Sequence, residues 1–174
     1  MNFYGKDARF TVVAWIKRSP KEQKECQAIA GVWNESTSQR QYCLFIDLGI
    51  WDSDNQICGH VSSIGGATPG FNHCMDAAIG STIIPLEEWH MIAFTYDGSY
   101  AKVYLDGKLD ERDQLNPYAY PDGLFDGGEG GADFTIGSVS RHGEMGNWFC
   151  GLLGGLAIYN QALVEDQIMP IVYY

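Results

Sequence analysis

The stretch EWHMIAFTYDGSYAKVYLDGKLD, residues 88–110, contains two runs rich in β-branched and aromatic residues on either side of a tight-turn dipeptide. We expect the runs Trp89–Tyr96 and Tyr100–Leu105 to form a β-hairpin. Asp97-Gly98 between them suits the positive φ of a tight turn, and Asp106-Gly107 gives a second turn before Lys108. Alternation along the second strand predicts that one set of side chains faces the core, namely Ala101, Val103 and Leu105. The other set faces outward, namely Tyr100, Lys102 and Tyr104.

Other runs along the chain have the same strand-like composition and end at turn residues. They are Phe10–Arg18, Ala28–Trp33, Gln41–Leu48, Ile57–Ser63, Phe134–Val139 and Leu152–Tyr159. Within the third run, one face is predicted to carry Tyr42, Leu44, Ile46 and Leu48 and the other Cys43, Phe45 and Asp47. Leu163–Ile168 is long enough for one helical turn. Many strands without a long helical pattern exclude α/β architectures and predict a sandwich or barrel in a single domain.

The chain is acidic, with a formal net charge of −11 over 174 residues. Such a surface repels phosphates and anionic lipid, so nucleic acid is not expected as a partner. Neutral or cationic ligands, or a divalent metal, suit it better. No run approaches the length of a membrane span, so membrane insertion is not expected, and the N-terminus has no signal-peptide pattern.

Five cysteines are an odd number, so at least one thiol is free or pairs between chains. Their spacing matches no zinc pattern. Cys43 and Cys150 lie in apolar runs typical of buried structural thiols. Cys58 and Cys74, on either side of a glycine-rich loop, are the only pair for which we predict a disulfide.

Several segments resemble the laminin-G-like (concanavalin A-like lectin/glucanase) family. Residues 88–110 are similar to its central hairpin, W-H-x-x-x-x-T-Y-D-G followed by Y-x-D-G. FTVVAWIKR (10–18) resembles its early strand, and FTIGSVS (134–140) and FCGLLGGLAIYNQALVEDQI (149–168) resemble its closing strands. The resemblance implies an all-β, antiparallel two-sheet jelly-roll β-sandwich over residues 1–174. The fold alone does not define a function.

Two departures from the family pattern bear on the domain. Many relatives carry an acidic pair in the last strand, and its aspartate commonly helps bind calcium; this sequence has Gly154-Gly155 there. Relatives also usually have a strand upstream of the F-T-x-x-A-W segment, where only residues 1–9 are present. We expect a domain excised from a larger protein, or a replacement strand from another segment such as Ile171–Tyr174.

Catalytic patterns are scarce. The E-x-D-x-x-E run of jelly-roll glucanases is absent, and Glu87-Glu88 would point to opposite sides of a strand. Tyr159-Asn160-Gln161 matches the Y-N-Q of jelly-roll alginate lyases without their other motifs. No G-x-S-x-G or comparable nucleophile pattern is present. We interpret the chain as more typical of a binding module than of an enzyme.

Three loops supply candidate ligand-binding residues. Residues 60–76 offer His60, Asn72, His73 and Asp76; residues 116–133 offer Tyr118 and Tyr120 as stacking surfaces; and residues 141–148 offer Arg141, His142 and Trp148. Each set also has a structural interpretation, as a rigid cover or as core packing. Calcium is a possible cofactor, with oxygen ligands from Asp122, Asp126 and Glu129, although no EF-hand spacing is present.

The sequence therefore favours a non-catalytic carbohydrate-binding or adhesion module of a secreted or surface protein. Its expected partner is a polysaccharide or other glycan, and a protein is a second candidate partner. The alternatives are a structural or protein-interaction domain without a small ligand, and a jelly-roll polysaccharide hydrolase or lyase. Residues 1–174 carry no targeting signal of their own, so the expected extracellular or cell-surface location depends on the family resemblance.

Overall fold

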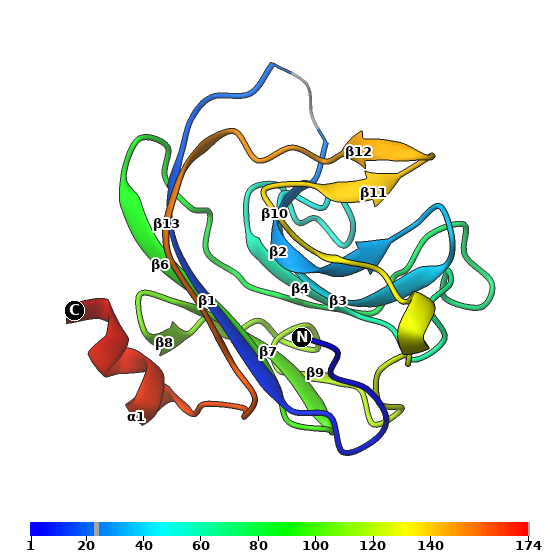
Figure 1. Cartoon of the computed structure of the whole chain (residues 1–174). Helices are drawn as coiled ribbons and strands as arrows, with labels where there is room; N and C mark the ends of the chain where they lie inside the picture. Colours follow the sequence, from blue (N-terminus) through cyan, green and yellow to red (C-terminus); the bar gives the residue numbers. More distant parts are fainter. Residues whose placement is uncertain (23–24, 174) are drawn as a thin grey trace.

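The computed structural model describes residues 1–22 and 25–173, which form two β-sheets packed face to face (Figure 1). The β1 sheet runs in the order β13 (Gly151–Tyr159), β1 (Phe10–Arg18), β6 (Trp89–Tyr96), β7 (Tyr100–Leu105), β8 (Lys108–Leu109), with β9 (Tyr118–Ala119) also on β7. The β3 sheet runs in the order β12 (Glu144–Gly146), β11 (Val139–Arg141), β2 (Gln27–Asn34), β3 (Gln39–Ile46), β4 (Ile57–Val61), β5 (Ala77–Ile79), with β10 (Phe134–Ile136) also on β2. The named strands pair antiparallel except β11 with β2, where Ser140 meets Asn34, and an isolated parallel bridge joins Arg18 and Leu86. The predicted two-sheet β-sandwich is confirmed.

The hairpin strands β6 and β7 and the early strand β1 begin and end at the residues predicted from the sequence. At the second hairpin turn, Asp106 and Gly107 have φ of +48° and +84°, as a two-residue turn of mirror-image type requires. The run predicted as one strand over 134–139 is instead two, β10 and β11, because the chain turns at Gly137 with φ of +73°. β5, β9 and β12 were not predicted, since each has only two or three residues.

The main core lies between the sheets, where the inward side chains of both interdigitate. Along β3, Tyr42, Leu44 and Ile46 share one face as predicted, and this face points into the core. The prediction for Leu48 is wrong: β3 ends at Ile46, and Asp47 has a φ of +60° that turns the chain. Leu48 consequently packs on the opposite, outer face of the β3 sheet.

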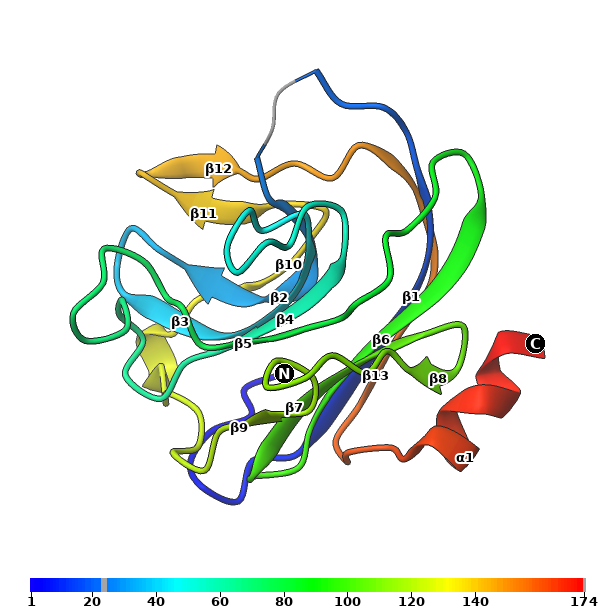
Figure 2. The ribbon, with the colours of Figure 1, turned by 180° about the vertical axis from the view of Figure 1, so that it is seen from behind.

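The outer face of the β1 sheet is covered by the C-terminal segment, α1 (Glu165–Ile168) and η2 (Met169–Tyr173) (Figure 2). Tyr104 faces outward as predicted but is buried beneath this cover beside Leu163 and Ile168. The replacement strand expected at 171–174 is not formed, because 169–173 is helical; Tyr174 lies outside the described residues. In the described part of the chain, no helix is long and apolar enough to cross a membrane.

All five cysteines are free, so the disulfide predicted between Cys58 and Cys74 is not formed. Both side chains are buried on the outer face of the β3 sheet, where they pack with Cys43 and Phe45. Their thiols point to backbone carbonyls, Cys58 to Gln56 and Cys74 to Val61. Cys43 is buried, as its apolar surroundings predicted, whereas Cys150 is partly exposed.

Candidate functional site

Three rings form an aromatic floor on the outer face of the β3 sheet. Trp33, Phe45 and His60 point outward from β2, β3 and β4, because alternation along each strand sends their neighbours into the core. The ring centroids are 5.1 Å apart for Trp33 and His60, 5.6 Å for Trp33 and Phe45, and 5.5 Å for Phe45 and His60. Only 3% of Trp33 is exposed, so the floor is rigid and closely packed.

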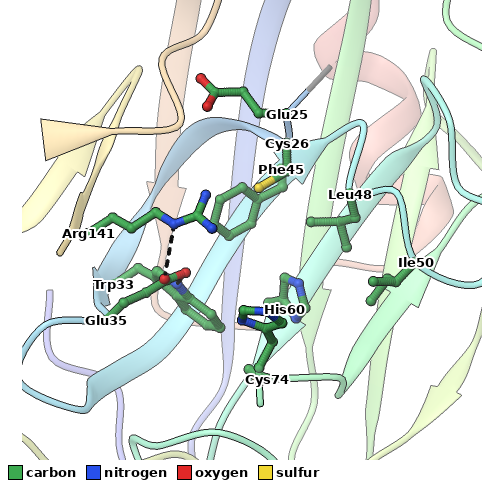
Figure 3. A pocket seen from close by; sticks show the side chains of 11 residues that line it. Glu25, Cys26, Trp33, Glu35, Phe45, Leu48, Ile50, His60, Cys74 and Arg141 are labelled. Atoms are coloured by element: carbon green, nitrogen blue, oxygen red, sulfur yellow. Dashed lines mark hydrogen bonds and ion pairs between the residues drawn. The ribbon is translucent and has the colours of Figure 1, made fainter. Parts of the chain in front are cut away.

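A cavity of about 280 Å³ lies over this floor (Figure 3). Arg141 and Glu35 lie on one side of it, and Leu48 and Ile50, from the chain that follows β3, lie on the other. Cys74 closes it from below in the view of Figure 3. The cavity thus has apolar surfaces facing a small group of charged side chains, as ligand sites commonly do.

A second cavity, of about 520 Å³, adjoins the first and shares Glu35 and His73 with it. Asn72, His142 and Arg40 also line it. We call the combined depression the histidine cleft, defined by the residues Trp33, Glu35, His60, Asn72, His73, Arg141 and His142. Three of the four histidines of the protein line it.

Glu35 organises the charges of the histidine cleft. Its Oε2 lies 3.4 Å from Arg141 Nε and 3.9 Å from Arg40 Nη2. Its Oε1 accepts a hydrogen bond of 3.4 Å from the indole N–H of Trp33. The guanidinium of Arg40 lies 5.7 Å from the centre of the Trp33 ring, within the range of a cation–π contact. Both arginines therefore have a fixed position beside the aromatic floor.

The loop between β11 and β12 is tied to the turn after β2. Ser140 pairs with Asn34, and the N–H of Gly143 donates a 2.7 Å hydrogen bond to Ser36 Oγ. These contacts hold Arg141 and His142 beside the cleft. The mirror-image backbone at His142, with φ of +52°, is part of the same tight turn.

His60 is neutral in the folded protein. Burial lowers its pKa to about 4, outweighing a backbone hydrogen bond at Asp76 that acts in the opposite direction. The ring Nδ1 lies 3.0 Å from the carbonyl oxygen of Asp76. A carbonyl only accepts, so Nδ1 carries the proton and Nε2 is left as an acceptor.

The structure brings together five of the predicted ligand-binding residues: His60, Asn72, His73, Arg141 and His142. Asp76 and Tyr118 lie elsewhere, where the phenol of Tyr118 donates a 3.0 Å hydrogen bond to Asp76 Oδ1. Tyr120 lies in the main core between the sheets, where its ring packs against Tyr96 and its phenol oxygen forms hydrogen bonds with Ser63, so it does not line the cleft. Trp148 is 56% exposed but is not among the residues that line the cleft.

The acidic residues predicted to bind calcium do not gather. Within residues 1–22 and 25–173, no three His, Cys, Asp or Glu side chains are placed to hold a metal ion. Asp126 Oδ1 instead accepts hydrogen bonds from Asn2 Nδ2 and the N–H of Gly128. Asp122 and Glu129 take no part in a cluster with it.

Sequence reasoning missed the residues that connect the cleft: Glu35, Arg40 and Phe45. Glu35 stands in a polar turn, NESTSQR, that gives no local sign of a function. Phe45 was predicted on the strand face opposite to Tyr42 and Leu44, and that alternation is the one signal that could have placed it on the floor. Trp33, at the end of β2, had no assigned role and is one of the three rings of the floor.

The model of the concanavalin A-like lectin/glucanases superfamily matches residues 2–169. The chain therefore belongs to this superfamily. No curated protein sequence matches it.

Solved structures with the same fold include the CBM40 domain of the Ruminococcus gnavus IT-sialidase, with 15% identity and a TM-score of 0.65 over 95% of this chain and 83% of that one. A Bacteroides ovatus protein, provisionally described as carbohydrate-binding, has 18% identity and a TM-score of 0.63 over 94% of this chain. Domain 4 of AbnA, a GH43 extracellular arabinanase from Geobacillus stearothermophilus, solved with arabinotriose, has 20% identity and a TM-score of 0.57 over 95% of this chain. The chain spans 40% of the Bacteroides protein and 66% of the arabinanase domain. At these identities the likeness is one of fold.

Proposed function

We propose that the chain is a carbohydrate-binding module whose ligand enters the histidine cleft. The observation that carries this proposal is the combination of an aromatic floor with a rim of directional hydrogen-bonding groups. A sugar presents C–H surfaces and hydroxyl groups, so it needs both kinds of partner. The carbohydrate-binding neighbours with the same fold support the same class of ligand.

The polar groups of the cleft offer donors and acceptors of fixed direction. Arg141 can donate from Nη2 to hydroxyl or carboxylate oxygens of a sugar, since Glu35 lies against Nε and Asn147 Oδ1 accepts from Nη1. His60, in its Nδ1–H tautomer, offers an acceptor. These groups are already held in place by the protein, which lowers the entropic cost of binding.

We propose that the module is not catalytic. Glycoside cleavage by the common mechanism needs two carboxyl groups across the bond, one of them able to donate a proton. The carboxylates that line the smaller cavity, Glu25 and Glu35, are both engaged: Glu25 lies 2.9 Å from Lys21 Nζ, and Glu35 pairs with two arginines. No release of reducing sugar is expected from a polysaccharide that the module binds.

We also propose that the module works outside the cell or at its surface. The arabinanase whose domain has the same fold is extracellular, and polysaccharide substrates are found there. Fractionation of the cells that produce the protein, with detection by an antibody against it, tests this location; recovery only in the cytoplasmic fraction would contradict it.

The binding proposal is tested by a glycan array followed by titration calorimetry of the strongest oligosaccharide. Arg141→Gln should weaken binding about tenfold or more, because a charge-assisted hydrogen bond is lost. Arg9→Gln is the matched control, since Arg9 is exposed and bonds only to the backbone of Asp7. Absence of binding to every glycan, or an equal effect of the two variants, would contradict the proposal.

A further inference from the structure

A third cavity, of about 410 Å³, opens beside the histidine cleft. Trp51 and Phe71 line it and are 49% and 50% exposed, an unusual degree of exposure for such large apolar rings. Its lining also includes Tyr118, Asp76, Asp113 and Gln114. We call this cavity the aromatic cleft, defined by those six residues.

The two clefts lie on opposite sides of two chain segments, residues 50–51 and 71–75. In each of three pairs of consecutive residues, one residue lines the histidine cleft and the other lines the aromatic cleft. Ile50, Asn72 and Cys74 line the histidine cleft, and their neighbours Trp51, Phe71 and Met75 line the aromatic cleft. A wall one chain thick, built from residues 50–51 and 71–75, therefore separates the clefts.

This wall is braced by side-chain contacts. Asp76 accepts hydrogen bonds from Thr68 Oγ1 at 2.6 Å and from the phenol of Tyr118 at 3.0 Å. Arg112 donates from Nη2 to the carbonyl oxygen of Trp51 at 2.6 Å, which holds the Trp51 backbone at a φ of +50°. The aromatic cleft is thus formed before any ligand arrives, which favours binding.

The chemistry of the aromatic cleft fits a neutral sugar residue. Exposed indole and phenyl faces can stack on the C–H surface of a pyranose or furanose ring, and the Asp113 and Gln114 side chains can accept from or donate to hydroxyl groups. No lysine or arginine is among its lining residues, whereas two carboxylates are. An anionic sugar would therefore be repelled here.

We propose that the aromatic cleft is a second saccharide subsite, and that the ligand is an oligosaccharide chain with neutral residues that crosses the 71–75 wall to occupy both clefts. This inference rests on the proposed carbohydrate-binding function and adds to it the length of the ligand. Two linked contacts act as one intramolecular event, so affinity should rise steeply once a chain is long enough to reach both.

The test is titration calorimetry with arabino-, xylo- and cello-oligosaccharides of one to six residues. For the wild type, hexasaccharides of the preferred series should bind at least about tenfold more tightly than disaccharides. Trp51→Ala and Phe71→Ala should each remove most of that gain, about tenfold, while the affinity for disaccharides stays unchanged. Trp148→Ala is the matched control, because Trp148 is equally exposed but lies outside both clefts.

The possible failures can be told apart. If hexasaccharides bind no more tightly than disaccharides, or if Trp51→Ala and Phe71→Ala behave like Trp148→Ala, the second subsite is contradicted while the histidine cleft stands. If neither these oligosaccharides nor any glycan of the array binds to the wild type, the carbohydrate-binding function fails and the second subsite fails with it. Thermal melting of each variant checks the fold, and Phe71 at the exposed loop tip gives a variant with little structural risk.

Discussion

The indole of Trp33 and the imidazole of His60 lie 5.1 Å apart although their strands, β2 and β4, are separated by β3. Phe45, on the intervening strand, contacts both rings edge to face. The three side chains therefore exclude water from one another and fix the floor of the histidine cleft. His60 is neutral as a consequence of this burial.

The burial of His60 predicts a pH dependence of stability. Its pKa is about 4 in the folded state and about 6.5 in an unfolded chain. Between these values the unfolded state binds a proton that the folded state does not, so stability falls as the pH is lowered from 6.5 to 4. The loss should be on the order of 3 kcal/mol. Urea unfolding across this range should show a steeper loss for the wild type than for His60→Gln; parallel curves would contradict the assignment.

A close contact between the sheets predicts the effect of one added methyl group. A Cβ at Gly59 would lie 2.3 Å from the ring of Phe94, which is fully buried. Gly59→Ala should therefore destabilise the protein by about 1–3 kcal/mol. Gly66→Ala, where a Cβ meets nothing within 4 Å, is the control and should be nearly neutral. Urea denaturation curves of the two variants measure the difference, and equal midpoints would contradict this packing.

The free cysteines should differ in their reactivity. Burial raises the pKa of Cys43 and Cys58 well above the ordinary value, and raises that of Cys26 and Cys74 to about 11. Thiolates are the reactive form, so iodoacetamide at pH 8 should label Cys150 first. Peptide mass spectrometry of the folded and the guanidinium-unfolded protein measures the order. Early labelling of Cys43 or Cys58 would show that the outer face of the β3 sheet is open.

Calcium is expected to have little effect on stability. The acidic residues considered as ligands, Asp122, Asp126 and Glu129, do not converge in the described part of the chain. A ligand that binds only the folded state raises the melting temperature, and the rise grows with the logarithm of the ligand concentration once that exceeds Kd. Differential scanning calorimetry with calcium and with EDTA should give the same melting temperature. A rise that grows with calcium concentration would indicate a site built from other oxygen atoms.

Local signals were sufficient for the long strands and insufficient for the shortest strands and for the cleft. The hairpin of β6 and β7 follows from turn chemistry and from composition within 17 residues, both of which can be read locally. The histidine cleft joins β2, β3 and β4 to a loop that follows β11 and lies about 100 residues away along the chain. The pairing of Ser140 with Asn34, which brings Arg141 to Glu35, has no counterpart in any local pattern.

The two tyrosines near the prolines illustrate a different limit. Tyr118 and Tyr120 are two residues apart, so strand alternation places them on the same face and does not show how deeply each is buried. The structure turns Tyr120 into the core beside Tyr96 and leaves Tyr118 at the edge of the aromatic cleft. The decision depends on the pairing of β9 with β7, a strand too short to be predicted from its composition.

The most direct test of the central claim is an NMR titration of the ¹⁵N-labelled protein with the oligosaccharide that it binds best. The largest shift changes should occur at the indole N–H of Trp33 and at the amides of His60, His73 and Arg141, with little change in α1 and β8 on the far side of the molecule. Shift changes centred on α1 and β8, or no saturable change at all, would contradict the assignment of the histidine cleft as the carbohydrate-binding site.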